Sequence, residues 1–251
     1  MEILACIKRV PITGSQLMLT PDNLNLLTDN LGYGISPHEE NAVEAGVQLT
    51  EQIGGVLTLL TLGPTDAEEQ LRASLAVGAT RGILLETDGQ DWDPQATANA
   101  LVEAIKVEPV NFDLIIFGAE SADSAGYQIH IRVAHALNLP IITNVKAMRI
   151  ENGMVRAERV VGQQREIYEA QLPAIVTVRD GLNVPRYPSV PGRMQARKKT
   201  VDIKSVGGYA PKLEKLKLNV VPSKESGAEI LGSGPDAVPA LVEKLIQMGV
   251  I

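Results

Sequence analysis

Residues 56–85 read VLTLLTLGPTDAEEQLRASLAVGATRGILL, an apolar run, a helical pattern and a second apolar run. Val56–Leu62 and Ile83–Leu85 are short and apolar, as buried strands are. Between them, Thr65–Glu68 has the spacing of a capping box and predicts a helix that begins there, continues to Val77 and ends at Gly78. A strand, a helix and a strand in this order predict a βαβ unit, and hence a parallel sheet with a right-handed crossover.

The same alternation extends to both sides of this unit. Ile3–Ile7 and Leu114–Phe117 are further apolar runs. Helical patterns lie at His38–Ile53, from Asp93-Pro94 to about Val107, and at Ala125–Leu137. Together these patterns predict an α/β fold, with a parallel Rossmann-like sheet and helices on both of its faces.

Beyond Pro140 the pattern changes to short strands joined by turns. Val145–Ile150 and Met154–Val160 flank Asn152-Gly153, a strong hairpin signal, and Arg165–Ala170 and Ala174–Val178 follow. We interpret residues of about 144–178 as a small antiparallel flap on the parallel core. Residues 1–183 then form one nucleotide-binding-type α/β domain that includes this flap.

Residues 184–251 are expected to form a loop, an extended basic arm and a terminal helix at Asp236–Met248. The whole chain has a net charge of −7, but residues 186–224 carry ten Lys or Arg and two Asp or Glu, a local charge of +8. Nucleic acid would favour aromatic side chains beside such charge, and only Tyr187 and Tyr209 occur there. The arm and its helix are therefore expected to dock on a partner subunit.

Composition limits the class of protein. The chain has 251 residues and a single cysteine, Cys6, so an internal disulfide is excluded and a reducing, cytoplasmic location is expected. The sequence contains no run of 18 apolar residues, so it predicts no membrane span. Met1 leads directly into an apolar run without a basic segment before it, which indicates a first strand and not a signal peptide.

Three motifs are weaker than they look. Gly232–Ala237 spells a dinucleotide fingerprint, but too few residues follow it to complete a βαβ unit. His130 and His135 are five residues apart, not four, so a zinc site on one helix face is not expected. Cys6 lies in an apolar run without a basic neighbour on its own face, which favours a core residue over a reactive thiol.

Three segments follow predicted strands and therefore meet at the carboxyl edge of the sheet: Lys8–Pro11, Leu62–Pro64 and Gly118–Gln128. Open α/β sheets bind ligands at this edge, and the small residues of the third segment could offer backbone N–H groups to a phosphate. Every α/β fold has loops there, so the pattern alone leaves a nucleotide site and ordinary loops as alternatives.

Five segments that extend over nearly the whole chain form one pattern: Leu4–Val10, Ile35–Glu44, Leu62–Pro64, Leu75–Ala79 and Gly181–Lys199. In this order they resemble the opening strand, the helix start, the Gly-Pro turn with the Leu-Ala-Met-Gly-Ala segment that follows it, and the basic loop of electron transfer flavoprotein beta subunits. The most specific part reads Leu-Asn-Val-Pro-Arg-Tyr-Pro, followed by Met-Gln-Ala-Arg-Lys-Lys.

The resemblance implies a heterodimer with a larger alpha subunit that holds most of one FAD. It implies AMP in this chain, or a second FAD at the same place in electron-bifurcating members. The implied nucleotide contacts are Cys6, Ser36, Leu62, Gly118, Ala119, Glu120, Ser121, Ala122, Asp123, Ser124, Ala125, Gly126, Tyr127, Gln128 and Ile129. Thr13 and His38 fall near the flavin of the alpha subunit. The implied contacts with dehydrogenase partners are Tyr187, Val190, Pro191, Met194, Arg197, Lys198 and Lys199.

The expected function is electron transfer without a substrate reaction, so neither catalytic residues nor metal ligands are assigned. Two alternatives stay open. One is electron bifurcation with a second FAD, because the loop from Asp123 to Ile129 matches the AMP-binding and the bifurcating patterns only in part. The other is a stand-alone nucleotide-binding protein of similar architecture.

Overall fold

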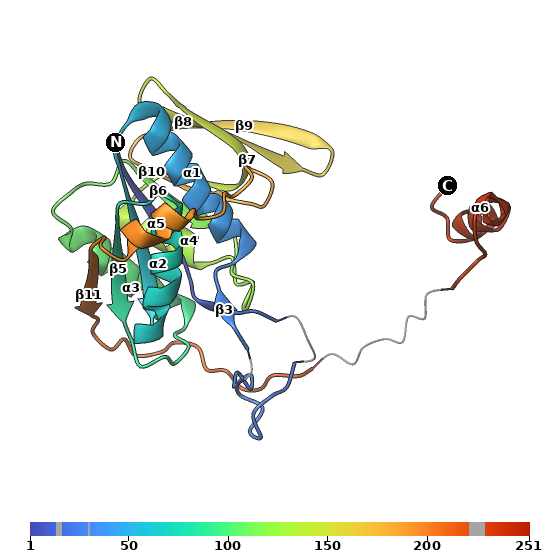
Figure 1. Ribbon diagram of the computed structural model, residues 1–251, viewed down its shortest axis with the longest axis horizontal. Coiled ribbons are helices and arrows are strands. Elements are labelled where there is room, and N and C mark those ends of the chain that lie inside the picture. Colours follow the sequence, from blue (N-terminus) through green and yellow to red (C-terminus); the bar gives the residue numbers. More distant parts are fainter. Residues whose placement is uncertain (14–16, 30, 221–228) are drawn as a thin grey trace. The chain divides into compact units, whose positions relative to one another are not determined.

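The computed structural model describes residues 1–13, 17–29, 31–220 and 229–251 (Figure 1). The chain divides into two compact units. The first contains Met1–Leu17 and Leu27–Leu216, and the second contains Met18–Leu26 and Lys217–Ile251. Each unit is described by itself.

A nine-stranded sheet in the order β11-β5-β4-β1-β6-β10-β7-β8-β9 forms the centre of the first unit. Neighbours from β11 to β7 pair in parallel, and β8 pairs antiparallel with both β7 and β9. The strands are β1 (Glu2–Cys6), β4 (Val56–Gly63), β5 (Arg81–Glu86), β6 (Leu114–Gly118), β7 (Ile141–Glu151), β8 (Met154–Val161), β9 (Gln164–Gln171), β10 (Ala174–Val178) and β11 (Val201–Ser205). Two short strands, β2 (Val10–Pro11) and β3 (Tyr33–Gly34), pair antiparallel beside it.

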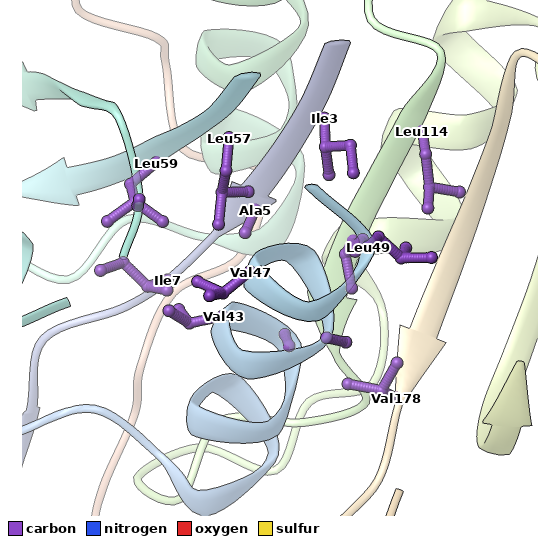
Figure 2. Close-up of a cluster of buried hydrophobic side chains, with 14 of the residues drawn as sticks. Ile3, Ala5, Ile7, Val43, Val47, Leu49, Leu57, Leu59, Leu114 and Val178 are labelled. Atoms are coloured by element: carbon purple, nitrogen blue, oxygen red, sulfur yellow. The ribbon is translucent and has the colours of Figure 1, made fainter. Parts of the chain in front are cut away.

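Helices cover both faces of the sheet, as the sequence predicts. Because side chains alternate along a strand, Ile3 and Ala5 of β1 pack on one face and Leu4 and Cys6 on the other. The first face carries α1 (Pro37–Ile53), α2 (Glu68–Val77) and α5 (Val190–Ala196), and the second carries α3 (Pro94–Val107) and α4 (Ile129–Leu137). Figure 2 shows part of the core on this first face, where Val43 and Val47 of α1 point toward the strand residues.

Two helices begin at capping residues. Ser36 caps α1, and Glu39 completes the box by accepting a hydrogen bond from the Ser36 N–H. Asp93 caps α3 by accepting from the N–H groups of Gln95 and Ala96. The short helix η1 (Thr65–Ala67) precedes α2, so the predicted helix from Thr65 to Val77 is confirmed with a tighter first turn. The predicted capping box at Thr65 is wrong, because the Thr65 hydroxyl donates to Glu86 and not to the helix backbone.

The Asn152-Gly153 hairpin is confirmed, but one strand of the predicted flap is not part of it. Asn152 and Gly153 have φ values of 51° and 74°, as a two-residue primed turn requires. Ala174–Val178, which we placed in the flap, is β10, and it pairs in parallel with β6 and β7 inside the main sheet. All five of its residues are buried, because helices cover both faces there.

The predicted start of α4 at Ala125 is wrong, and the helix begins at Ile129. Ala125 and Tyr127 have φ values of 45° and 52°, in the left-handed region, so the chain cannot be α-helical before Gln128. The loop at this end of β6 is therefore four residues longer than the sequence pattern indicates.

The prediction of a loop and an extended basic arm after residue 183 is also corrected, because part of this segment is regular structure. Val190–Ala196 is the helix α5, and Val201–Ser205 is β11, which extends the sheet by pairing with β5. Glu108 at the end of α3 forms ion pairs with Arg81 of β5 and Lys204 of β11, which fastens the added strand. Residues up to Leu216 thus belong to the first unit.

The second unit combines a turn with the end of the chain. Leu19 bridges to Leu26, and the Leu218 N–H donates to the Asn23 carbonyl over 2.8 Å. The helix η2 (Pro235–Ala237) leads into α6 (Val238–Gln247), which matches the predicted terminal helix within one or two residues at each end. No α6 side chain is buried. Among the helices that the structure describes, none is long and apolar enough to cross a membrane.

Candidate functional site at the carboxyl edge of β1 and β6

The strand order reverses at β1. The chain adds β4 and β5 on one side of β1 and then places β6 on the other side. Open α/β sheets bind ligands at the carboxyl ends of the strands beside such a reversal. We call this place the switch-point edge; it comprises residues 6–9, the first turn of α1 and the loop 118–128.

Gly118 allows α1 to approach the end of β6 closely. A Cβ atom on Gly118 would lie 2.9 Å from the Glu39 Cγ and 3.1 Å from both the Glu39 nitrogen and the His38 Cβ. Ser36 then reaches the loop, because its Oγ accepts a hydrogen bond from the Ala122 N–H over 2.9 Å. The structure therefore brings the predicted residues Ser36, Gly118 and Ala122 together at the N-terminus of α1.

An ion pair and a buried carboxyl group lie at the same edge. Lys8 Nζ is 2.5 Å from Asp123 Oδ2, and although burial opposes ionisation, Lys8 holds the pKa of Asp123 below its usual value. Glu39 is only 6% exposed. Burial raises the pKa of Glu39 to about 8, against the opposing effects of the Ser36 N–H and Lys8, so this carboxyl group is mostly protonated at neutral pH.

Cys6 is a buried free thiol at the end of β1. Burial first, and the nearby Glu39 second, raise its pKa far above the usual value, so the thiolate is not formed at neutral pH. Its interpretation as a core residue is confirmed.

The loop 119–128 contributes backbone N–H and C=O groups to the switch-point edge more than it contributes charged side chains. Ala119 is buried and donates its N–H to Val178 of β10. Most of the remaining predicted contacts are exposed or half-buried: Glu120, Ser121, Ala122, Asp123, Ser124, Ala125, Gly126, Tyr127, Gln128 and Ile129. Asp123 does not cap α4, whose N-cap is Gln128; its carboxylate pairs with Lys8.

His38 lies at the same edge of the sheet. His38 is buried, and its Nε2 lies 3.3 Å from Asp180 Oδ1 in the loop after β10. Its Nδ1 is buried without a hydrogen-bond partner among the described residues. Lys146, with a smaller effect of His38, keeps the pKa of Asp180 low. Thr13 is exposed, and Leu62 is half-buried at the end of the neighbouring β4.

A shallow hollow lies next to the switch-point edge, after β1 and β4. Arg9, Thr65, Asp66, Glu68, Glu69 and Arg72 line it. Arg9 stacks on Tyr33, with its guanidinium carbon 3.3 Å from the ring centre. Since its lining mixes acidic and basic groups, this hollow has no preference for an anion.

The segment predicted to contact dehydrogenases is exposed but not extended. Tyr187, Val190 and Met194 are 95%, 74% and 65% exposed. Pro191 lies in the first turn of α5, where its fixed φ suits a helix, so this part of the predicted loop is helical. Lys199 differs from the exposed Arg197 and Lys198, because its Nζ donates to the carbonyls of Leu75 and Ala79 at the end of α2.

Sequence reasoning missed three residues at this edge: Lys8, Glu39 and Asp180. Lys8 and Glu39 were within segments that we quoted, but nothing local indicated that one would pair across the sheet and the other be buried. Asp180 lies two residues after the end of β10, and recognition of β10 as a parallel strand would have placed it at the carboxyl edge.

His130 is buried, whereas His135 is exposed on the same helix. Burial lowers the pKa of His130 to about 4, and its ring lies 6.2 Å from that of Phe117. In the described parts of the chain, no group of three His, Cys, Asp or Glu side chains is arranged to hold a metal ion.

Comparison with known proteins decides the family. The family model of the electron transfer flavoprotein domain matches residues 23–207, well over half of the chain. The chain belongs to the electron transfer flavoprotein family. This family membership gives an electron-transport role and association with a flavin.

Curated members of the electron transfer flavoprotein family match the chain from end to end. The protein named electron transfer flavoprotein subunit beta from Thermoanaerobacterium thermosaccharolyticum is 34% identical, and the match covers 100% of both chains. A protein of the same name from Bacillus subtilis is 31% identical over 98% of this chain and 97% of its own. The one from Megasphaera elsdenii is 29% identical over 98% and 97%.

Proposed function

We propose that the chain is the beta subunit of a heterodimeric electron transfer flavoprotein. It pairs with a larger alpha subunit that holds most of the FAD, and it passes electrons from dehydrogenases to an acceptor without a substrate reaction of its own. The relatives named subunit beta support this, because they match this chain over its full length. We also propose that the protein is located in the cytoplasm.

The switch-point edge is proposed to bind the phosphate and adenosine of a nucleotide. The observation that carries this is the Ser36–Ala122 hydrogen bond, since it ties the N-terminus of α1 to the loop after β6. A helix N-terminus favours an anion by about 0.3–1 kcal/mol, and exposed loop backbone adds N–H donors. Lys8, with a side chain 34% exposed, supplies a positive charge at the same place.

Asp123 is the residue that a phosphate would have to tolerate. Its negative charge is already compensated by Lys8, and Glu39 beside it is mostly neutral at pH 7. The edge therefore carries little net negative charge when Lys8 and Asp123 are counted together. The residues present fit a nucleotide, with AMP or the adenosine part of an FAD as the two forms to distinguish.

The second unit is proposed to dock on the alpha subunit. Val238, Leu241, Val242 and Ile246 form an apolar stripe at helical spacing on α6, and they are 40–59% exposed. Such a stripe on a ten-residue helix is stable when a partner covers it, because short isolated helices are marginal in water.

The exposed apolar residues Tyr187, Val190 and Met194 are proposed to contact the dehydrogenase, with Arg193, Arg197 and Lys198 around them. We call this set the docking patch. Its apolar members would supply affinity, and its charges would speed the encounter.

Co-expression with the alpha subunit tests the proposal. The purified complex is treated with acid, and the released flavin and adenine nucleotides are counted per heterodimer. One FAD and one AMP supports simple electron transfer, whereas two FAD would show the bifurcating alternative. A stable monomer that binds no alpha subunit would contradict the proposal and favour a stand-alone nucleotide-binding protein.

A further inference from the structure

The loop that leads from β10 to α5 runs along α1 through paired polar side chains. Asp180, Asn183 and Arg186 are three residues apart, and they meet His38, Asn41 and Glu44, which are also three residues apart on one face of α1. We infer that Glu44, acting through Arg186, positions the docking patch; this inference rests on the proposed function of that patch.

Arg186 is held by two carboxylates at once. Its Nε and Nη2 donate to Glu44 over 2.9–3.1 Å, and its Nη1 and Nη2 donate to Glu51 over 2.7 and 2.9 Å. The backbone N–H of Arg186 also donates to Glu44. A guanidinium group held by two carboxylates has a fixed direction, so its own backbone is fixed as well.

Glu44 differs from Glu51 in its surroundings. The Glu44 side chain is 2% exposed, whereas that of Glu51 is 54% exposed. Gln48 donates a further hydrogen bond to Glu44 over 2.8 Å. Because Glu44 is enclosed by its own chain, it cannot touch a docking protein, and any influence on docking must pass through Arg186.

The docking patch begins at the residue after Arg186. Tyr187 is 95% exposed, and Ser189 then caps α5 by accepting from the Gly192 N–H. With Arg186 held on α1, the chain that leads into α5 is fixed where the docking patch begins.

The other end of α5 is fixed to α2, which it lies against in Figure 1. Arg72 of α2 donates to the carbonyls of Ala196 and Lys199, each over 2.8 Å. The first turn of α5 also packs on α2, because a Cβ atom on Gly192 would lie 2.5 Å from the Ala76 carbonyl oxygen. With both ends held, Val190 and Met194 face outward in one arrangement before any partner arrives, which limits the entropy lost on docking.

Direct contact between Arg186 and the dehydrogenase is the alternative explanation for any effect of Arg186. The two can be separated because Glu44→Gln removes the charge of the buried partner and leaves Arg186 able to meet a dehydrogenase. Glu51→Gln is the matched control, since it also removes a carboxylate from Arg186 but at an exposed position.

The test measures amide hydrogen exchange of residues 187–196 in the purified heterodimer, and it needs no dehydrogenase. Glu44→Gln and Arg186→Met are expected to raise exchange there about tenfold, with strands β1 and β4 unchanged and Glu51→Gln having a smaller effect. The double variant is expected to match Arg186→Met, because both changes break one interaction. Arg186→Lys should lie between wild type and Arg186→Met. Unchanged exchange in Glu44→Gln and Arg186→Met would overturn the inference.

A second measurement uses the dehydrogenase that reduces the wild-type heterodimer. Glu44→Gln is expected to raise the KM for the flavoprotein about five- to tenfold at unchanged kcat and flavin content. If Val190→Ala raises this KM and Glu44→Gln does not, the patch is correct and the positioning role is wrong. If neither Val190→Ala nor Tyr187→Ala changes this KM, the proposed docking patch itself is wrong, and Glu44 then has no docking surface to position.

Discussion

Lys8 and Asp123 join the carboxyl ends of β1 and β6 through an ion pair with an Nζ–Oδ2 distance of 2.5 Å. The two residues are 115 positions apart in the sequence, and they meet because β6 is placed beside β1 at the reversal of strand order. The pair lies next to Ala122, whose N–H is already bonded to Ser36. A phosphate at the N-terminus of α1 would therefore lie near the one ammonium group that the described loops bring to this place.

Lys8→Met is expected to weaken adenine nucleotide binding to the heterodimer by about tenfold or more, because a charge-assisted hydrogen bond contributes about 1.5–3 kcal/mol. It also leaves Asp123 without its cation. Isothermal titration with AMP measures the change. Lys106→Met, at an exposed lysine of α3, is the control and should bind AMP as the wild type does. Equal affinity in Lys8→Met would remove Lys8 from the site.

Glu39 predicts a pH dependence of stability with a definite sign. Its pKa is about 8 in the folded chain against an ordinary value of 4.5. Between these values the folded state binds the additional proton, so the free energy of unfolding falls as pH rises from about 4.5 to 8, by up to about 1.4 kcal/mol per pH unit. Glu39→Gln should remove this slope and stabilise the chain at pH 8, because the amide oxygen can still accept from the Ser36 N–H.

Urea unfolding of the heterodimer between pH 5 and pH 9 measures the slope. Glu69→Gln, at an exposed position of α2, is the control and should follow the wild-type curve. Parallel curves for Glu39→Gln and wild type would show that the carboxyl group is already ionised in the folded chain at pH 5.

Gly118→Ala is expected to separate α1 from the end of β6. The new methyl group would lie 2.9 Å from the Glu39 Cγ and 3.1 Å from the Glu39 nitrogen, and the helix backbone cannot yield as a flexible side chain can. Overpacking of this kind costs about 1–3 kcal/mol of stability. Thermal unfolding checks it, together with AMP binding. Gly126→Ala in the same loop has nothing within 4 Å and should be close to neutral.

The parallel core could be predicted from the sequence because its signals are local. The capping residue Asp93 stands directly before an apolar helical pattern, and the strands are apolar runs buried on both faces. The structure follows these signals within a few residues at each boundary.

The edge strand β11 and the helix α5 could not be found in this way. β11 is five residues long, carries Asp202 and Lys204, and pairs with β5, more than a hundred residues earlier. α5 has seven residues and only one of them is buried, so it shows no helical pattern of apolar residues. Both elements depend on tertiary contacts, which a reading of local periodicity cannot detect.

The candidate site was likewise predicted only in part from the sequence. The place of the site follows from strand order, and Ser36 and the loop after β6 were named from the family resemblance. The charges that act there were not, since burial of Glu39 and pairing of Lys8 with Asp123 arise only when α1, β1 and β6 are assembled.

The second unit is expected to be needed for assembly and not for the sheet. A chain that ends after Leu216 keeps the contacts of Tyr209 with Trp92 and of Lys212 and Leu213 with Asp93, the N-cap of α3. Its circular dichroism should therefore show an intact α/β fold. Its affinity for the alpha subunit should fall at least tenfold, because the apolar stripe of α6 is lost. Analytical ultracentrifugation measures this. The point variant Leu241→Asp should act in the same direction, and full assembly of both would exclude α6 from the interface.

Val190→Ala tests whether the docking patch supplies affinity. Val190 is 74% exposed on α5, so truncation should leave the melting temperature unchanged while the kcat/KM for reduction by the dehydrogenase falls about fivefold or more, as for an apolar anchor at an interface. Val160→Ala, at a 55% exposed valine of β8, is the control and should keep wild-type rates. Neutralising Arg197 and Lys198 should instead lower the association rate and flatten its dependence on salt. A lower melting temperature with unchanged electron transfer would show that Val190 packs within its own chain.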